Sequence, residues 1–235
     1  MAELILAIDQ GTTSTTVLLV DRKLCVKARA STEFPQLYPK PGWVEHDPEA
    51  IWKSTLATIK KVLVKGKVKV KDIVAIGITN QRETTTVWDR RTGQSLYNAI
   101  VWQCRRTTDI CNRLRRQGYQ EMITKKTGLV LDPYFSGSKI KWLMENVPGL
   151  KSKSQAGRVC FGTVDSFLTY RLTGGVSHVT DVSNASRTLL LDIKNIRWDS
   201  ELIEVFDVVP EMLPELRGSS DLFGVTKGIK VLPDG

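Results

Sequence analysis

Short apolar runs separated by polar turns open the chain. Residues 4–8 and 17–20 form two such runs, and the polar stretch 9–14 lies between them. Runs of this length predict β-strands, and Gly11 supplies the backbone freedom that a tight reversal needs. A third run covers residues 25–31. The pattern therefore predicts three consecutive strands in an antiparallel meander.

A helix and a different kind of strand follow. Asp47 and Pro48 are typical of an N-cap and a first helical position, and apolar residues recur at helical spacing after them. Residues 73–79 are then almost continuously apolar. Strands covered on both faces show this pattern, so we expect residues 73–79 at the centre of the sheet.

The rest of the chain alternates between strand and helix patterns. Strands are predicted at residues 84–89, 97–101 and 159–162. Residues 102–106 lead into a predicted helix that runs to about 117, and further helices are predicted at 138–146, at 164–172, and from about 200 and 210. Residues 179–187 carry short polar side chains and are typical of a loop that crosses a ligand cleft. Together these elements describe an α/β protein.

Length and composition describe an ordinary globular chain. Its 235 residues are 41% hydrophobic and 25% charged, enough for one large domain or two small ones. No apolar run approaches the roughly 20 residues that span a bilayer, and no charged region with a cleavage site precedes the first strand. We therefore expect no membrane span and a cytoplasmic location.

Four cysteines and two histidines are scattered along the chain without a C-x-x-C spacing. A metal site built from thiolates and imidazoles is therefore not expected. We expect Cys25, Cys104, Cys111 and Cys160 to be reduced and to serve packing.

The net charge of +9 raises nucleic acid as a partner class. However, the basic clusters at residues 60–71 and 105–116 carry no interleaved aromatic residues for base stacking. A solvated basic face explains them better, so no nucleic-acid partner is expected. The same charge fits a domain that handles phosphoanions, or one separated from an acidic partner domain.

The polar turn between the first two strands is the first candidate site. Gly11 permits close approach of a ligand, successive amides can form an anion-binding concavity, and Thr12, Thr13 and Ser14 add hydroxyl donors. Asp9 ends the first strand, where a carboxylate would hold Mg²⁺ through water. The turn suits a phosphate and its metal. It is not a P-loop, and an ordinary hairpin would use the same residue types.

Polar residues after the strand at 73–79 form the second candidate site. Arg82 and Glu83 offer adjacent donors and acceptors, which a grip on neighbouring hydroxyls requires; the alternative is a surface ion pair. Trp102 follows a strand and would be either core or a wall for a ligand. Tyr134 would supply a hydroxyl to a pocket, or simply pack.

Several long motifs carry these candidates in order. They are DQGTTS at 9–14, YPKPGWVEHD at 38–47, GITNQRET at 77–84 and WQCRR at 102–106. With these motifs the chain resembles the glycerol kinases of the FGGY carbohydrate kinase family. The likeness continues through residues 128–129, 132–137, 162–165 and 180–188. It covers only the N-terminal half of the proteins of this family.

The resemblance implies an actin-like, ribonuclease-H-like ATPase domain, with a mixed five-stranded sheet flanked by helices. Residues 1–235 would be the N-terminal domain that binds polyol and phosphate, and the family's C-terminal domain would be absent. The turn at Gly11, Thr12, Thr13 and Ser14 would contact the nucleotide phosphates, and Asp9 would serve Mg²⁺.

The implied substrate is glycerol. The positions matching Arg82, Glu83 and Tyr134 bind its hydroxyls in the family, and Trp102 matches an aromatic residue that packs on its carbon chain. The implied reaction is ATP-dependent phosphorylation of glycerol to glycerol 3-phosphate, with a homo-oligomer expected for the full-length enzyme. The alternatives are an FGGY kinase for another polyol or sugar, and a non-catalytic polyol-binding module.

Two departures from the family matter. Many glycerol kinases have arginine where this chain has Thr16, so one contact to the nucleotide phosphates would be lost. The catalytic base of the family is an aspartate in a Gly-Asp-Gln segment of the second domain, beyond Gly235. No catalytic residue is therefore expected within this half, and the half-chain alone should be inactive.

Overall fold

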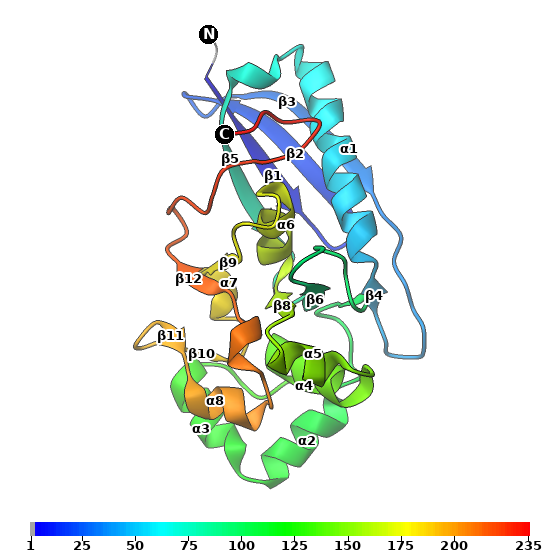
Figure 1. Cartoon of the computed structure of the whole chain (residues 1–235), viewed down its shortest axis with the longest axis vertical. Helices are drawn as coiled ribbons and strands as arrows, with labels where there is room; N and C mark the ends of the chain where they lie inside the picture. The colour runs from blue at the N-terminus through cyan, green and yellow to red at the C-terminus, as the bar shows by residue number, and fades with distance from the viewer. Residues whose placement is uncertain (1–2) are drawn as a thin grey trace.

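A mixed four-stranded sheet forms the upper part of the molecule in Figure 1. The computed structural model describes residues 3–235. The strands of this sheet are β1 (Leu4–Gln10), β2 (Ser14–Asp21), β3 (Val26–Glu33) and β5 (Ile73–Asn80), in the order β3-β2-β1-β5. The pairs β1–β2 and β2–β3 are antiparallel, whereas β5 runs parallel to β1. The predicted antiparallel meander is confirmed.

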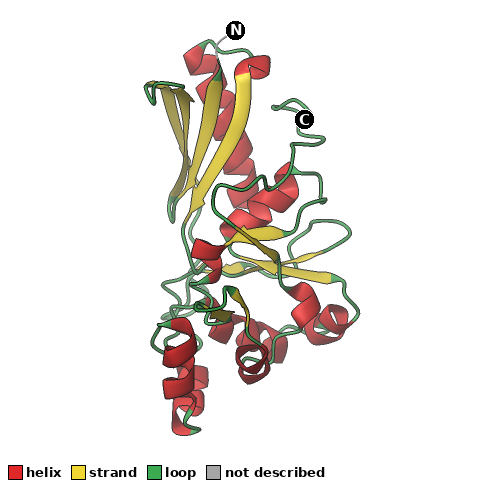
Figure 2. Ribbon diagram, turned by 90° about the vertical axis from the view of Figure 1, so that its left-hand side faces the viewer, coloured by secondary structure: helices red, strands yellow, loops and turns green. Residues whose placement is uncertain are grey.

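Helices cover one face of this sheet and leave the other open (Figure 2). Leu6 and Ile8 of β1 are buried in one core with Ile59 of α1 (Pro48–Gly66) and Phe167 of α6 (Val164–Leu172). Side chains alternate between the faces of a strand, so Asp9 lies on the opposite face, where it is exposed. The end of β1 thus presents a carboxylate on an uncovered surface.

The sequence signals for α1 are confirmed. Asp47 is the N-cap, and its carboxylate accepts a hydrogen bond from the backbone amide of Glu49 at 2.9 Å. Pro48 occupies the first turn, where no amide hydrogen is required of it. Capping of this kind contributes about 1 kcal/mol to helix stability.

β5 lies at the edge of the sheet, so the prediction that it forms the centre is wrong. Within residues 3–235 no strand pairs with its free edge, and Val74 is 60% exposed. Ile76 and Ile78 pack partly against the core beneath α1, whereas Ala75 and Gly77 are exposed. The apolar run looked continuous because small residues occupy the face that remains open.

The α/β class with a mixed sheet is confirmed, but the main sheet of residues 3–235 has four strands rather than five. The other strands pair in twos. These pairs are β4 (Glu45–His46) with β7 (Ala99–Ile100), β6 (Thr86–Asp89) with β8 (Val159–Gly162), β9 (Val179–Asp181) with β12 (Glu215–Arg217), and β10 (Leu191–Asp192) with β11 (Arg197–Trp198). None of these pairs hydrogen-bonds to β5, so none of them extends the main sheet.

A second core lies in the lower part of Figure 1. The helices around it are α2 (Thr108–Arg116), α3 (Tyr119–Thr127), α4 (Ser136–Asn146), α5 (Leu150–Gln155) and α8 (Ser200–Val205). Ile123, Ile140, Phe161 and Phe206 are buried in it. The remaining short elements are α7 (Val182–Ala185) and the single 3₁₀ turns η1 (Val70–Asp72) and η2 (Pro210–Met212).

Some predicted boundaries were wrong in this half. The helix expected after residues 102–106 is α2, whose bounds Thr108–Arg116 agree with the predicted end at about residue 117. The helix expected from about 210 is only the turn η2. α3 was not predicted, since only Ile123 and Thr127 are buried along it and apolar periodicity is therefore weak.

The four cysteines are free, and Cys104, Cys111 and Cys160 are buried as predicted. Burial raises the pKa of the Cys111 thiol to about 11 and that of Cys160 to about 12, so both stay protonated. Cys25 is exposed in the turn after β2, which contradicts its predicted packing role. Across residues 3–235 no helix is both long enough and apolar enough to cross a membrane.

Candidate functional site

The turn between β1 and β2 leaves backbone donors available. The amide of Gly11 donates to the carbonyl of Ser14 at 2.9 Å and closes the turn. Within the described part of the chain, the amides of Thr12 and Thr13 have no hydrogen-bond acceptor, and Thr13 is exposed. Free amides beside hydroxyl side chains suit an anion such as a phosphate oxygen.

Asp9 lies next to this turn with its carboxylate free. The strand registers pair it with Thr16 on β2 and Thr79 on β5, so these three positions form a row across the open face. In residues 3–235 the Asp9 carboxylate makes no hydrogen bond or ion pair, and no cluster of three potential metal-ligating side chains occurs. A single free carboxylate fits Mg²⁺, which keeps most of its water ligands.

Thr16 has its own partner on this face. Its hydroxyl donates to Ser31 Oγ on β3 at 3.2 Å. Position 16 is therefore beside Asp9, but its short side chain is engaged with the neighbouring strand.

A hydrogen-bonded path joins the turn to the segment after β5. Gln81 Nε2 lies 3.1 Å from the carbonyl of Gly11, and Thr84 Oγ1 donates to Gln81 Oε1 at 2.9 Å. His46 Nδ1 lies 3.2 Å from Gln81 Nε2, and burial lowers the pKa of His46 to about 4. A neutral imidazole can accept from the Gln81 amide, so His46 supports the path as an acceptor.

Trp102 touches both candidate sites. Its indole nitrogen donates to Thr12 Oγ1 at 3.0 Å, and its ring centroid lies 5.5 Å from that of Tyr134. Aromatic pairs at this separation contribute to packing without a specific fit. The residue expected to cover a carbon chain thus also contacts the turn expected to hold phosphate.

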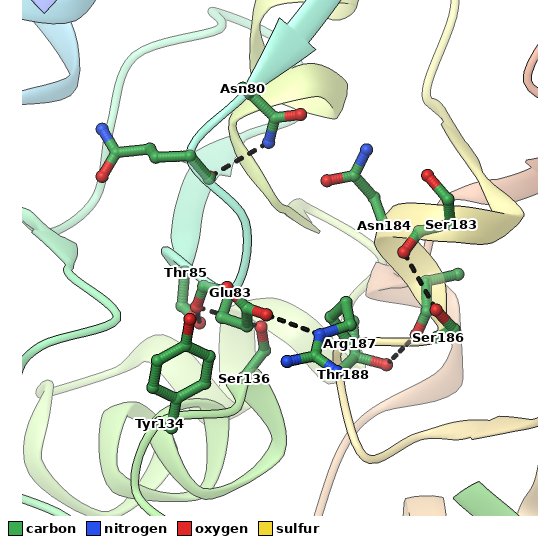
Figure 3. A network of polar contacts seen from close by, with 12 residues as sticks. Asn80, Glu83, Thr85, Tyr134, Ser136, Ser183, Asn184, Ser186, Arg187 and Thr188 are labelled. Carbon is green, nitrogen blue, oxygen red and sulfur yellow. Dashed lines mark hydrogen bonds and ion pairs between the residues drawn. The ribbon is translucent and has the colours of Figure 1, made fainter. Parts of the chain in front are cut away.

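Glu83 is held in place by Arg187. Its Oε1 accepts from Arg187 Nε at 2.6 Å, and Glu83 is only 3% exposed (Figure 3). Burial and the nearby charge of Glu83 raise the pKa of Tyr134, whose hydroxyl end is turned toward Glu83 in Figure 3. A carboxylate and a neutral phenol side by side can accept from and donate to adjacent hydroxyls of one ligand.

Arg82 is separated from this group. Its side chain is exposed, and within residues 3–235 it makes no ion pair or hydrogen bond. It lines a groove of about 680 Å³ between β5, α6 and the last residues of the chain. The alternative of an Arg82–Glu83 surface pair is wrong, because Glu83 is buried and pairs with Arg187.

Acidic and amide groups line the same groove. Asp165 is buried, and burial raises its pKa to about 6, although Thr180 donates to its carboxylate at 2.7 Å. Asp181 caps α7 and accepts from the backbone and side-chain amides of Asn184. The Asn184 Oδ1 atom is buried without a partner in the described residues.

Sequence reasoning missed Gln81, His46, Lys139 and Arg187. Arg187 ends the polar stretch 179–187, for which a loop across a ligand cleft is predicted. The loop prediction is wrong, because residues 179–185 form β9 and α7, but the polar composition of the stretch was the available signal. Lys139 gave no signal, because a lysine on a helix is usually exposed. The site combines Thr12, Glu83, Trp102 and Tyr134 from four distant segments, whereas Asp9 and Arg82 lie on separate surfaces beside it.

Three comparisons place the chain among known proteins. The profile of the N-terminal domain of the FGGY family of carbohydrate kinases matches residues 4–230. Glycerol kinase from Methylobacterium nodulans is 54% identical over 226 residues, covering 96% of this chain and 45% of the relative. Glycerol kinase 2 from Thermotoga maritima is 52% identical over 222 residues, covering 94% of this chain and 45% of the relative. The chain thus spans about half the length of these relatives.

Solved structures give the same picture. The crystal structure of Plasmodium falciparum glycerol kinase with ADP has a TM-score of 0.92 at 37% identity, covering 99% of this chain and 46% of that one. The structure of gluconate kinase from Lactobacillus acidophilus has a TM-score of 0.85 at 26% identity, covering 97% of this chain and 44% of that one.

Proposed function

Because this chain belongs to the FGGY family of carbohydrate kinases, we propose that it is the polyol- and phosphate-binding half of an ATP-dependent glycerol kinase. The proposed enzyme transfers the γ-phosphoryl group of ATP to a primary hydroxyl of glycerol and releases glycerol 3-phosphate. Residues 1–235 then form the N-terminal domain, and a C-terminal kinase domain completes the enzyme. "Full-length enzyme" below means this chain together with that domain.

The observation that carries the proposal is the double contact of Trp102. One edge of its indole donates to Thr12 in the turn, and its ring packs against Tyr134. A polyol lying on Trp102 would therefore have its hydroxyls close to phosphates held by the turn. Phosphoryl transfer depends mainly on positioning the two substrates and neutralising charge, so this adjacency is the feature that the reaction needs.

The polar residues have separate proposed roles in binding hydroxyls, phosphate and metal. Glu83, fixed by Arg187, accepts a hydrogen bond from one hydroxyl, and Tyr134 donates to another. The free amides of Thr12 and Thr13, with the Ser14 hydroxyl, bind phosphate oxygens, and the cationic side chain of Arg82 faces the groove beside them. Asp9 would hold Mg²⁺, which supplies neutralisation of the phosphate charge when it is bound.

The proton on the attacking hydroxyl needs an acceptor outside this group. Glu83 Oε1 is already engaged by Arg187 Nε at 2.6 Å, so this carboxylate has a partner of its own. We therefore propose that the base is supplied by residues beyond Gly235, as the resemblance implies.

Substrate competition in the full-length enzyme tests the proposal. We expect kcat/KM for glycerol to exceed that for xylulose and for gluconate, the sugar and sugar acid named for structural relatives at 26–27% identity. A higher kcat/KM for either sugar would replace glycerol as the substrate. Binding of glycerol without any phosphoryl transfer by the full-length protein would favour the non-catalytic module.

A further inference from the structure

Lys139 is a buried amine at the centre of the candidate site. It lies in the first turn of α4 and its side chain has no exposure to solvent. Its Nζ donates to the backbone carbonyl of Glu83 at 2.9 Å and to that of Tyr134 at 2.6 Å. Within residues 3–235 it forms no ion pair with a carboxylate.

This arrangement is costly if its role is packing alone. Burial without a paired carboxylate disfavours the charged ammonium and lowers the pKa of Lys139 to about 7, and the start of a helix likewise favours negative rather than positive charge. A methionine or leucine would fill the same volume without that cost. The two carbonyls that Lys139 binds belong to the two residues that we assign to the glycerol hydroxyls.

The carbonyl of Glu83 is held especially firmly. Ser136 Oγ donates to it at 3.2 Å and Thr85 Oγ1 at 3.3 Å, in addition to Lys139. Glu83 has a φ of +62°, in the left-handed region that a residue with a side chain rarely adopts. Several donors on one carbonyl stabilise this conformation, which turns the Glu83 side chain toward Arg187 (Figure 3).

We propose that Lys139 is a positioning residue that sets the separation and orientation of Glu83 and Tyr134, and so determines how well the site fits a vicinal polyol. This inference rests on the proposed function. Glu83 follows β5 and Tyr134 precedes α4, and Lys139 is the one side chain among the described residues that hydrogen-bonds the backbones of both. Its contribution is to geometry, since it does not touch the substrate itself.

The test compares two variants of α4 in the full-length enzyme. Lys139→Met keeps the length of the side chain and removes its donors. Ile140→Ala, the control, weakens packing of the same helix in the lower core and removes no hydrogen bond, because the isoleucine side chain has no donor. We expect Lys139→Met to raise the KM for glycerol at least tenfold with little change in the KM for ATP, and with a melting temperature no lower than that of Ile140→Ala.

Ile140→Ala should lower the melting temperature and leave the KM for glycerol within twofold of the parent. An unchanged KM for glycerol in Lys139→Met, or an equal rise in the KM for ATP, would refute the positioning role. If Lys139→Met does not fold, Ser136→Ala replaces it. That variant removes another donor to the Glu83 carbonyl, so a smaller rise of the glycerol KM supports the proposal and no rise refutes it.

Failure of the proposed function is separable from failure of this inference. If the parent enzyme prefers another polyol or sugar, the same variants are measured with that substrate. A selective KM rise for it in Lys139→Met would keep the positioning role while replacing glycerol. An unselective or absent effect would refute the role of Lys139 whichever substrate is used.

Discussion

At the scale of single residues, the pair of Glu83 and Arg187 determines what the site can recognise. The Arg187 guanidinium lies 4.9 Å from the centroid of the Phe135 ring and is about one-third exposed, whereas Glu83 is buried. The carboxylate is therefore oriented before a ligand arrives. A preorganised acceptor loses less entropy on binding than one that must be ordered.

Glu83→Gln in the full-length enzyme should raise the KM for glycerol and weaken discrimination against propanediol, with the KM for ATP little changed. Loss of the charged acceptor leaves Arg187 and a ligand hydroxyl poorly paired. This costs roughly 1–3 kcal/mol of binding free energy, which corresponds to a KM about 5- to 150-fold higher. Steady-state kinetics with both polyols measures this. Glu145→Gln is the matched control, because Glu145 forms an exposed pair with Arg113 far from the site. Equal kinetics in both variants would contradict the assignment of Glu83.

Asp9→Ala should abolish Mg²⁺-supported turnover and leave glycerol binding and the melting temperature nearly intact. The carboxylate is exposed and has no partner in the described residues, so its removal costs no contact of the fold. Turnover assays, calorimetry with glycerol and thermal melting separate these effects. A fall in glycerol affinity as large as the fall in turnover would instead make Asp9 structural.

At the scale of secondary-structure elements, β4 is a short strand whose main contribution is one side chain. His46 is fully buried and connects Gln36 to Gln81, which in turn contacts the turn at Gly11. Its pKa is lowered to about 4 from an ordinary 6.5 because burial disfavours the charged ring. Folding therefore requires His46 to be neutral over this range.

Stability should consequently fall as the pH drops from about 6.5 toward 4. In this range the unfolded chain binds a proton at His46 and the folded chain does not, so acid favours unfolding. Urea unfolding at a series of pH values measures how steeply the free energy of unfolding changes with pH, and His46→Gln should make that slope shallower.

Asp165 acts in the opposite direction, since its raised pKa of about 6 adds stability as the pH falls below that value. A slope unchanged in His46→Gln would show that other groups dominate.

Element by element, the sequence predicts best where local signals coincide with burial. The first three strands, α1 with its Asp47 cap, and α6 follow from apolar pattern and capping residues. The predicted central position of β5 is wrong because small residues such as Ala75 and Gly77 can lie on an exposed face and still count as apolar. An edge strand with such a face has the same apolar pattern as a central strand. The two-residue strands β4 and β7 exist only through tertiary pairing, so no local pattern predicts them.

The site was predictable to the extent that its residues lie in polar segments after strands. Gly11, Thr12 and Glu83 could be found in this way, and Trp102 and Tyr134 became specific only through the family resemblance. Lys139 and Arg187 act through contacts with residues distant in sequence. Such contacts leave no periodic signal, which is why the sequence alone did not identify them.

At the scale of the whole molecule, the candidate site lies between two cores. The upper core supplies the turn through β1 and β2, and α4, packed in the lower core, supplies Lys139 directly behind Tyr134. The open face of the sheet carries Asp9, and the groove beside β5 carries Arg82. The surfaces that carry Asp9 and Arg82 are therefore more open than the surroundings of the buried Glu83.

Residues 1–235 alone should not phosphorylate glycerol measurably. We expect this because the proposed general base lies in the other half, and base and positioning terms together can exceed a factor of 10⁴. Formation of glycerol 3-phosphate by the purified chain, with circular dichroism to confirm folding, measures it. The full-length enzyme is the positive control. Substantial product from the half-chain would overturn the assignment of the base.

The free edge of β5 has a consequence for handling this chain. Its unpaired amides and carbonyls, beside an exposed Val74, offer a template for a strand from another molecule. Neither a proline nor a charged side chain interrupts Ile73–Asn80, and these are the residues that usually prevent such pairing. Self-association of the isolated half-chain should therefore grow with concentration, and a single lysine introduced at Val74 should suppress it.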